Sequence, residues 1–145
     1  MRRYSLLASL LLLAVSAAFA GQPESIEQLK QRADAASPGS QPKLYLALAR
    51  RHLDAAQTAF DQGNIEAGHI AVDGAVNAFE SAASAAVTSR KYLKDGEIRM
   101  REMARRLDSM RRPLGIEDRE RLQVAIDRMD KARNRLVNAM FGSKS

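Results

Sequence analysis

The chain has 145 residues, of which 23 are Lys or Arg and 17 are Asp or Glu, giving a formal net charge of +6 at pH 7. It contains no Cys and no Trp. The absence of Cys excludes disulfides, thiol catalysis and thiolate metal sites, and the absence of Trp removes the usual aromatic platform for sugars and bases.

The first twenty residues have the pattern of a secretory signal. Two arginines at positions 2 and 3 precede an apolar run over 6–15, and Ala18 and Ala20 supply small residues before a cut ahead of Gly21. The run is shorter than the roughly 20 apolar residues that a spanning helix needs. We therefore expect an exported protein, periplasmic or secreted, without a transmembrane segment after cleavage.

The next segment, 21–42, is predicted to be a short helix followed by a linker. The helix spans Gln22 to Ala36, with Pro23 in its first turn, where proline is well tolerated. It ends in a stretch rich in Ser, Pro and Gly over 37–42. Whether this leading helix docks on the rest of the chain stays open at the level of sequence.

The remaining segment, 43–142, is predicted to be a helical-hairpin domain. Apolar residues recur in alternating steps of three and four before and after a break at Gly63-Asn64, which predicts a tight antiparallel hairpin. The register implied by this short turn places Leu53 level with Gly74. The first stripe consists of Leu46, Ala49, Leu53, Ala56 and Phe60, and the second of Ile65, Gly68, Val72, Ala75, Phe79, Ala83 and Ala86.

A second hairpin follows the first. Its two helices are separated by Arg112-Pro113-Leu114-Gly115, a strong helix stop, and the last helix is predicted to begin near Glu117. The expected register places Leu107 opposite Leu122, Met103 opposite Ile126, and Leu93 opposite Leu136.

The two hairpins meet near residues 86–90, where no Gly or Pro permits a sharp reversal. We therefore expect an all-α fold of two consecutive antiparallel hairpins that share one long central helix. The alternative is a compact up-down four-helix bundle broken near Gly96. The hairpins also resemble each other, since Ala49 to Asp54 echoes Ala104 to Asp108.

One hairpin resembles a tetratricopeptide repeat over about residues 45–80. Gly63, Ile65, Val72 and Ala75 occupy the positions of that family's turn glycine and packing residues. Gly68 departs from the pattern because the family usually has Ala there. The resemblance implies protein–protein binding without catalysis. The chain is also similar to exported bacterial helical-hairpin proteins of unknown function.

Two sets of residues are candidate metal ligands. Asp61, Glu66 and His69 gather at the first hairpin turn, and Glu66-x-x-His69 has the spacing used in di-iron bundles, although those bundles need two such motifs. A solvated polar turn is the favoured interpretation. The second set is predicted to converge in the second hairpin and could bind Cu(I), but core packing is favoured over that role. This set is Met100, Met103 and Met129.

Positive charge is concentrated in the second half of the chain. Residues 21–89 contain five Lys or Arg and eight Asp or Glu, whereas 90–145 contain sixteen and nine. The i,i+4 pairs Glu97–Arg101, Glu102–Arg106 and Asp108–Arg112 favour a solvated helix face. The competing interpretation is a surface for an acidic partner, formed by Arg99, Arg101, Arg105, Arg106, Arg111 and Arg112.

The sequence contains no recognisable catalytic constellation, and we predict neither an enzyme nor a bound cofactor. We expect a non-enzymatic interaction or scaffold protein of the bacterial cell envelope, with a protein partner of acidic character or an anionic envelope surface. The alternative is a small periplasmic binding protein for a metal ion or an anionic envelope component. Nucleic acid is disfavoured by export and by the lack of aromatic residues among the basic ones.

Overall fold

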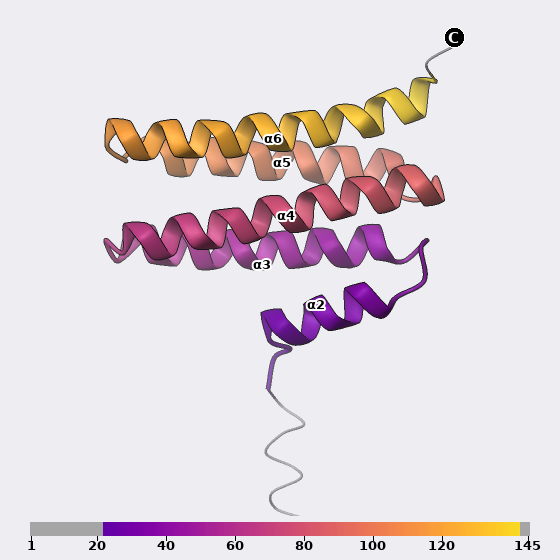
Figure 1. Ribbon diagram of the computed structural model, residues 1–145, viewed down its shortest axis with the longest axis horizontal. Coiled ribbons are helices and arrows are strands. Elements are labelled where there is room, and N and C mark those ends of the chain that lie inside the picture. Colours follow the sequence, from indigo (N-terminus) through magenta and orange to yellow (C-terminus); the bar gives the residue numbers. More distant parts are fainter. Residues whose placement is uncertain (1–21, 143–145) are drawn as a thin grey trace, which may run out of the picture.

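The computed structural model describes residues 22–142, which contain five helices and no strand. The predicted all-α class with two consecutive antiparallel hairpins is confirmed, and the predicted signal lies outside the described residues. The first hairpin pairs α3 with α4 and the second pairs α5 with α6 (Figure 1). The helices are α2 (Ile26–Ala35), α3 (Gln41–Asp61), α4 (Ile65–Ser89), α5 (Leu93–Arg111) and α6 (Ile116–Phe141).

Helix α2 begins with a capping box that the sequence analysis missed. The Ser25 hydroxyl accepts a hydrogen bond from the Gln28 backbone N–H at 3.1 Å, and the Gln28 side chain accepts one from the Ser25 N–H at 3.0 Å. This reciprocal arrangement satisfies two N–H groups that a helix start leaves unpaired. The helix therefore starts after Pro23, which was expected in its first turn.

Helix α2 docks on α3. Leu29 and Ala33 are 3% and 0% exposed, and the Tyr45 hydroxyl donates a hydrogen bond of 2.7 Å to Asp34. The question left open by the sequence is therefore answered, because α2 buries its apolar stripe against the first hairpin.

The α3–α4 hairpin has the register that its short turn predicts. Gly63 adopts a left-handed conformation with φ of +76°, which glycine tolerates without steric cost. A Cβ at Gly74 would lie 2.6 Å from the His52 ring, and one at Gly68 would overlap the ring of Phe60. Because Leu53 was expected opposite Gly74, the predicted register is correct to within one residue.

The expected long central helix is wrong, because the chain breaks between α4 and α5. Helix α4 ends at Ser89, and Arg90 and Tyr92 both have left-handed backbone conformations, with φ of 54° and 63°. Helix α5 then begins at Leu93. The alternative with separate helices is correct, although its break was placed near Gly96, which lies inside α5.

Contacts made by the two left-handed residues help to account for a break without glycine. The Arg90 guanidinium donates a hydrogen bond of 3.0 Å to the Ala139 carbonyl of α6. Tyr92 packs against the core, and its hydroxyl accepts a 2.7 Å hydrogen bond from Arg99 Nε. The contact of Arg90 links segments that are distant in sequence, so a local pattern of glycine and proline could not indicate the break.

The left-handed conformation of Arg90 leads to a stability prediction. Replacing Arg90 with Gly should raise the free energy of unfolding by about 0.5–1 kcal/mol, because glycine avoids the roughly 1–2 kcal/mol cost of a side chain in this conformation. This gain should exceed the loss of the exposed Arg90–Ala139 hydrogen bond. Urea unfolding followed by circular dichroism would measure the change. Ser89→Gly is the control, because a glycine in the last turn of α4 should instead lower stability by up to about 1 kcal/mol. Equal losses for both variants would contradict the prediction.

The α5–α6 hairpin agrees with the expected register to within one helical turn. Glu97 pairs with Arg133 at 3.1 Å, one residue from the predicted alignment, and a Cβ at Gly96 would lie 3.2 Å from Leu136 Cδ2, three residues from it. The Leu114 carbonyl at the turn accepts a 2.6 Å hydrogen bond from Arg119 Nε. This hydrogen bond ties the first turn of α6 to the connection between the two helices.

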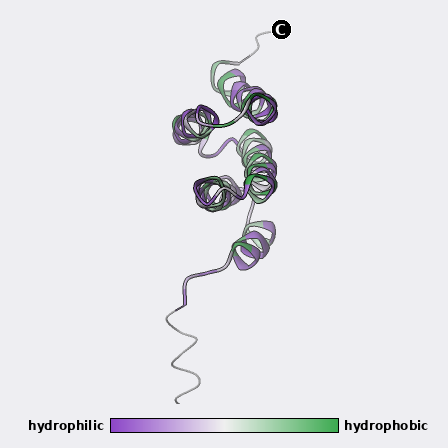
Figure 2. Ribbon diagram, turned by 90° about the vertical axis from the view of Figure 1, so that its left-hand side faces the viewer, coloured by the Kyte–Doolittle hydropathy of each residue, from purple (hydrophilic) through white to green (hydrophobic). Residues whose placement is uncertain are grey.

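The second hairpin stacks on the first with corresponding helices parallel. Helices α4 and α6 run in the same direction, because Glu80 contacts Arg128 and, further along both helices, Arg90 contacts Ala139. An ion pair between Asp54 and Arg106 joins α3 to α5, which also run in the same direction. Helices α3 and α5 form one layer, and α2, α4 and α6 form the other (Figures 1 and 2). This arrangement agrees with the sequence similarity between the two hairpins.

The core lies between these two layers, while the ends of the stack are mostly polar apart from the exposed Ile116, Val124 and Phe141 of α6. Exposed positions of the end helices are mostly polar, such as Glu27 and Lys30 on α2 and Glu120 and Lys131 on α6, as expected for terminal helices of a stack. None of the described helices has the length and apolarity of a membrane span. The largest fully buried side chains are Phe79, Leu53, Met100, Leu107, Leu122, Met129, Leu136, Val72, Val76 and Pro42.

Candidate functional site

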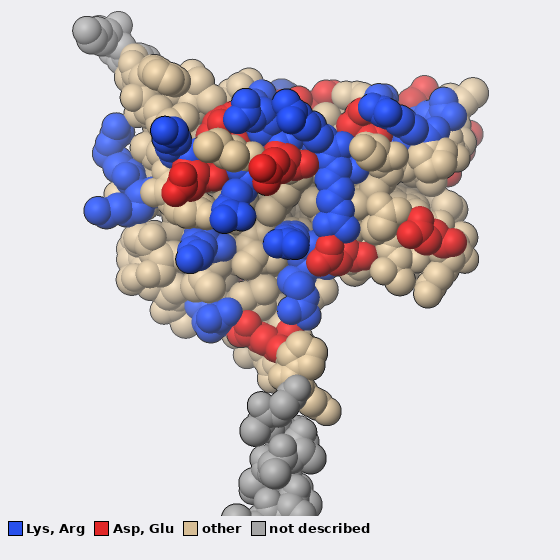
Figure 3. Space-filling model, turned by 180° about the vertical axis from the view of Figure 1, so that it is seen from behind, with Lys and Arg blue, Asp and Glu red and all other residues tan. Residues whose placement is uncertain are grey.

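Charge differs between the two layers of the stack. Helix α5 contains six Lys or Arg and four Asp or Glu, whereas α4 contains three acidic residues and no Lys or Arg. The α3–α5 side therefore presents most of the uncompensated positive charge. Figure 3 shows this face, on which Lys and Arg side chains crowd around fewer acidic ones.

A groove of about 500 Å³ runs over α3, between α2 and α5. Lys43, Arg50 and Arg99 contribute its main cationic side chains, and Leu46 and Met103 lie among its apolar residues. We call it the α3–α5 groove. Its other lining residues are Glu24, Leu29, Arg32, Ala47, Arg51, Asp54 and Tyr92.

Some cations near this groove are neutralised by acids. Arg32 pairs with Glu24 at 2.8 Å, and Arg106 pairs with Asp54 at 2.6 Å. Arg51 donates a hydrogen bond of 2.8 Å to the Glu24 carbonyl. These contacts hold α2, α3 and α5 together. The two acidic residues of the groove, Glu24 and Asp54, are therefore both engaged in ion pairs.

Four cations of the α3–α5 groove have no acidic partner among the described residues, because Arg51 donates only to a neutral carbonyl and the other three form no ion pair. Within residues 22–142, no carboxylate lies within ion-pair distance of Lys43, Arg50 or Arg99. Arg99 is positioned by the neutral Tyr92 hydroxyl at 2.7 Å, and Glu102, which lines an adjacent hollow with Arg50 and Arg99, forms no ion pair with either arginine. A bound carboxylate could therefore form charge-assisted hydrogen bonds that the protein itself does not supply.

The floor of the α3–α5 groove is apolar. Leu46 is 2% exposed, and Met103 is partly buried against the core. Methionine adapts its shape to irregular apolar groups. The groove thus suits a ligand in which negative charges flank an apolar side chain.

A second groove, of about 540 Å³, lies between α5 and α6. Its cations are Arg101, Arg105, Arg112 and Arg133, and we call it the α5–α6 groove. Helix α5 separates it from the α3–α5 groove. The other lining residues are Ala104, Asp108, Ser109, Gln123, Ile126 and Asp130.

The six arginines predicted as one surface are divided between the two sides of α5. Arg99 and Arg106 line hollows on the α3 side, and Arg111 donates a 2.8 Å hydrogen bond to Gln123 of α6. The other three, Arg101, Arg105 and Arg112, line the α5–α6 groove. Sequence reasoning missed Lys43, Arg50 and Arg133, which only the packing of the helices brings to these grooves.

Two of the three predicted i,i+4 ion pairs of α5 form. Arg101 lies 3.6 Å from Glu97, and Arg112 lies 3.2 Å from Asp108. The Glu102–Arg106 pair does not form, because Arg106 turns to Asp54 of α3 instead. An inter-helix partner therefore replaces a local one.

The three candidate ligands at the first turn do not converge. His69 is 2% exposed, and its Nε2 lies 2.8 Å from Asp118 Oδ1 of α6. Glu66 pairs with Arg121, and Asp61 accepts a hydrogen bond from Gln57. Within residues 22–142, no group of three His, Cys, Asp or Glu has metal-binding geometry. His69 instead joins the two hairpins.

The three methionines do not form an exposed thioether cluster. Met100 and Met129 are completely buried in the core. Met103 is partly buried and lines the α3–α5 groove. Their positions support the favoured interpretation that Met100 and Met129 are packing residues.

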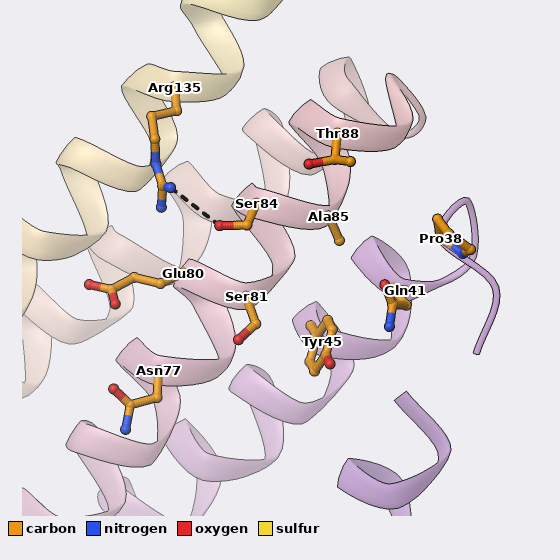
Figure 4. Close-up of a pocket in the computed structure, with 10 residues that line it drawn as sticks. All are labelled: Pro38, Gln41, Tyr45, Asn77, Glu80, Ser81, Ser84, Ala85, Thr88 and Arg135. Carbon is orange, nitrogen blue, oxygen red and sulfur yellow. Dashed lines mark hydrogen bonds between the residues drawn. The ribbon is translucent and has the colours of Figure 1, made fainter. Parts of the chain in front are cut away.

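A third groove, of about 690 Å³, lies on the opposite side of the stack (Figure 4). Ser81 and Ser84 of α4 lie along it, and Arg135 Nη1 donates a 3.3 Å hydrogen bond to Ser84. Tyr45 also lines it, and the hydrogen bond to Asp34 raises the pKa of Tyr45 to about 12. Mostly neutral side chains line this groove, and its two charged residues, Glu80 and Arg135, have opposite sign.

Comparisons with family models, curated proteins and solved structures found no match for this chain. The tetratricopeptide resemblance therefore stays a sequence-based expectation. The functional argument depends on the geometry and charge of the grooves.

Proposed function

We propose that the protein is a non-enzymatic interaction protein of the bacterial cell envelope that binds an acidic segment of a partner protein in the α3–α5 groove. The observation that carries the proposal is the presence of Lys43, Arg50 and Arg99 around an apolar floor, with no carboxylate of the described residues paired to them. Export is inferred from the leader-like sequence over 1–20.

The chemistry of the groove supports binding over catalysis. Arginine stays protonated in proteins, and an exposed lysine is protonated at neutral pH, so neither is a ready general acid or base. Such side chains instead recognise carboxylates through directed hydrogen bonds. Electrostatic attraction would also speed the encounter with an acidic partner.

The stacked architecture supports a scaffold role. Successive helical hairpins form a continuous face on which side chains from several helices act together. Arg50 of α3 and Arg99 of α5 meet in this way although they are distant in sequence. A partner segment lying across the face would contact both helices at once.

The proposal can be tested with fluorescently labelled acidic peptides that carry a central leucine. Reversing the charges of Arg50 and Arg99 to Glu should weaken binding by at least about tenfold, since losing a charge-assisted hydrogen bond costs roughly 1.5–3 kcal/mol. Fluorescence anisotropy at fixed ionic strength would measure the affinity. A peptide with Gln in place of its acidic residues should bind weakly to the unmodified protein.

A matched variant separates groove binding from general attraction to a basic protein. Lys94→Glu with Lys131→Glu makes the same change in net charge at exposed positions outside both basic grooves. This control should keep most of the affinity. If it loses as much affinity as the Arg50→Glu/Arg99→Glu variant, the α3–α5 groove is not the binding site.

A further inference from the structure

The α5–α6 groove contains more guanidinium groups than the nearby carboxylates can neutralise. Glu97 is shared by Arg133 at 3.1 Å and Arg101 at 3.6 Å. Asp108 is likewise shared, by Arg111 at 2.7 Å and Arg112 at 3.2 Å. Glu97 and Asp108 are thus each shared by two arginines, and three of these arginines line the groove, namely Arg101, Arg112 and Arg133.

One arginine of this groove has no acidic partner at all. The side chain of Arg105 is exposed and forms no ion pair with any of the described residues. The remaining acid of the groove, Asp130, lies 3.7 Å from Arg133 Nε, which is buried without a hydrogen-bond partner. Positive charge thus exceeds negative charge in the groove, and hydrogen-bond donors remain available.

The arginines are presented from a rigid support. Arg101 and Arg105 are one turn apart on α5, and Arg133 projects from α6, which packs antiparallel to α5. The groove wall between them contains Ala104 and Ile126, which are small or buried. Several guanidinium groups can therefore approach one compact anion without a rearrangement of the helices.

We propose that the α5–α6 groove binds a phosphate group, with Arg105 as the central ligand and Arg112, about two turns further along the same face at the end of α5, beside it. A phosphate carries up to two negative charges and several acceptor oxygens, so one group can accept hydrogen bonds from several arginines. A single carboxylate offers less charge and only two oxygens. The phosphate could belong to a lipid headgroup or be free in solution, and both sources have the same recognition chemistry.

Arginine side-chain NMR tests the proposal directly. Titrating inorganic phosphate into the protein at constant ionic strength should shift the Arg105 Nε–Hε resonance in a saturable way, whereas acetate and chloride should not. Arg105→Gln with Arg112→Gln should weaken phosphate binding by at least about tenfold. Both side chains are exposed, so the variant should stay folded. Lys94→Gln with Lys131→Gln is the control of equal charge change and should keep the affinity.

Vesicles distinguish the two sources of phosphate. Binding to phosphatidylglycerol vesicles but not phosphatidylcholine vesicles, lost in the Arg105→Gln/Arg112→Gln variant, would assign the site to a lipid headgroup. Binding of inorganic phosphate without vesicle binding would assign it to a free phosphate. The proposal is wrong if neither probe binds, or if the control loses as much affinity as the groove variant.

Phosphate binding in the α5–α6 groove should be independent of peptide binding in the α3–α5 groove. The Arg50→Glu/Arg99→Glu variant should bind phosphate within about threefold of the unmodified protein, because α5 lies between the two grooves and surface charges are screened over about a Debye length of 8–10 Å. The Arg105→Gln/Arg112→Gln variant should likewise retain peptide binding. Failure of one proposal would therefore leave the other open to its own test.

Discussion

Replacing Phe79 with alanine is expected to lower the free energy of unfolding by about 3–5 kcal/mol. Phe79 is the largest fully buried side chain of the described residues, with 0% exposure. It lies on α4, which packs against α3, α5 and α6. The alanine variant would leave a cavity in the part of the core that holds the two hairpins together.

Chemical unfolding monitored by circular dichroism would measure this loss. Phe141→Ala is the matched control, because Phe141 is 79% exposed and exposed substitutions usually change stability by less than about 0.5 kcal/mol. A Phe79→Ala variant as stable as Phe141→Ala would mean that α4 does not pack in the centre of the stack.

Replacing Asp118 with alanine should destabilise the fold by about 1–3 kcal/mol, because it leaves the buried His69 imidazole without its partner. The Asp118 carboxylate lies 2.8 Å from His69 Nε2, and the His69 ring also packs edge-on against Phe60, with centroids 5.5 Å apart. This contact joins the start of α6 to α4. Its loss should therefore loosen the docking of the second hairpin on the first.

A double-mutant cycle isolates this contact from the effect of charge at the start of α6. Glu117→Ala removes an acid from the same helical turn and should cost only about 0.3–1 kcal/mol. In a His69→Leu background, Asp118→Ala should cost no more than Glu117→Ala does. If Asp118→Ala has its full effect without His69, the hydrogen bond is not the reason for the loss.

Local patterns in the sequence predicted the hairpins well. The apolar stripes repeat with the period of a helix, and Gly63 provides the left-handed turn that a minimal connection requires. The register then follows from the length of the turn. The break at Arg90 and Tyr92 was missed because contacts with α6 and α5 accompany it, and no helix-breaking residue marks it.

The grooves could be predicted only in part. The sequence singled out six arginines, but it could not divide them between the two sides of α5 or add Arg50 from α3. The similarity between Ala49–Asp54 and Ala104–Asp108 was the available signal, because repeated hairpins stack with equivalent helices side by side. This similarity, read as a sign that equivalent helices stack, would have predicted that α3 lies next to α5.

The absence of basic residues from α4 has a practical consequence. No Lys or Arg occurs over 52–89, which covers most of the first hairpin. Trypsin, which cleaves after Lys and Arg, therefore leaves 52–90 as one long peptide. Amine-reactive crosslinkers can reach Lys43 beside the α3–α5 groove, but a partner held against α4 would escape them. Reagents that couple to the carboxylates of Glu66 and Asp73 are needed to detect such a partner.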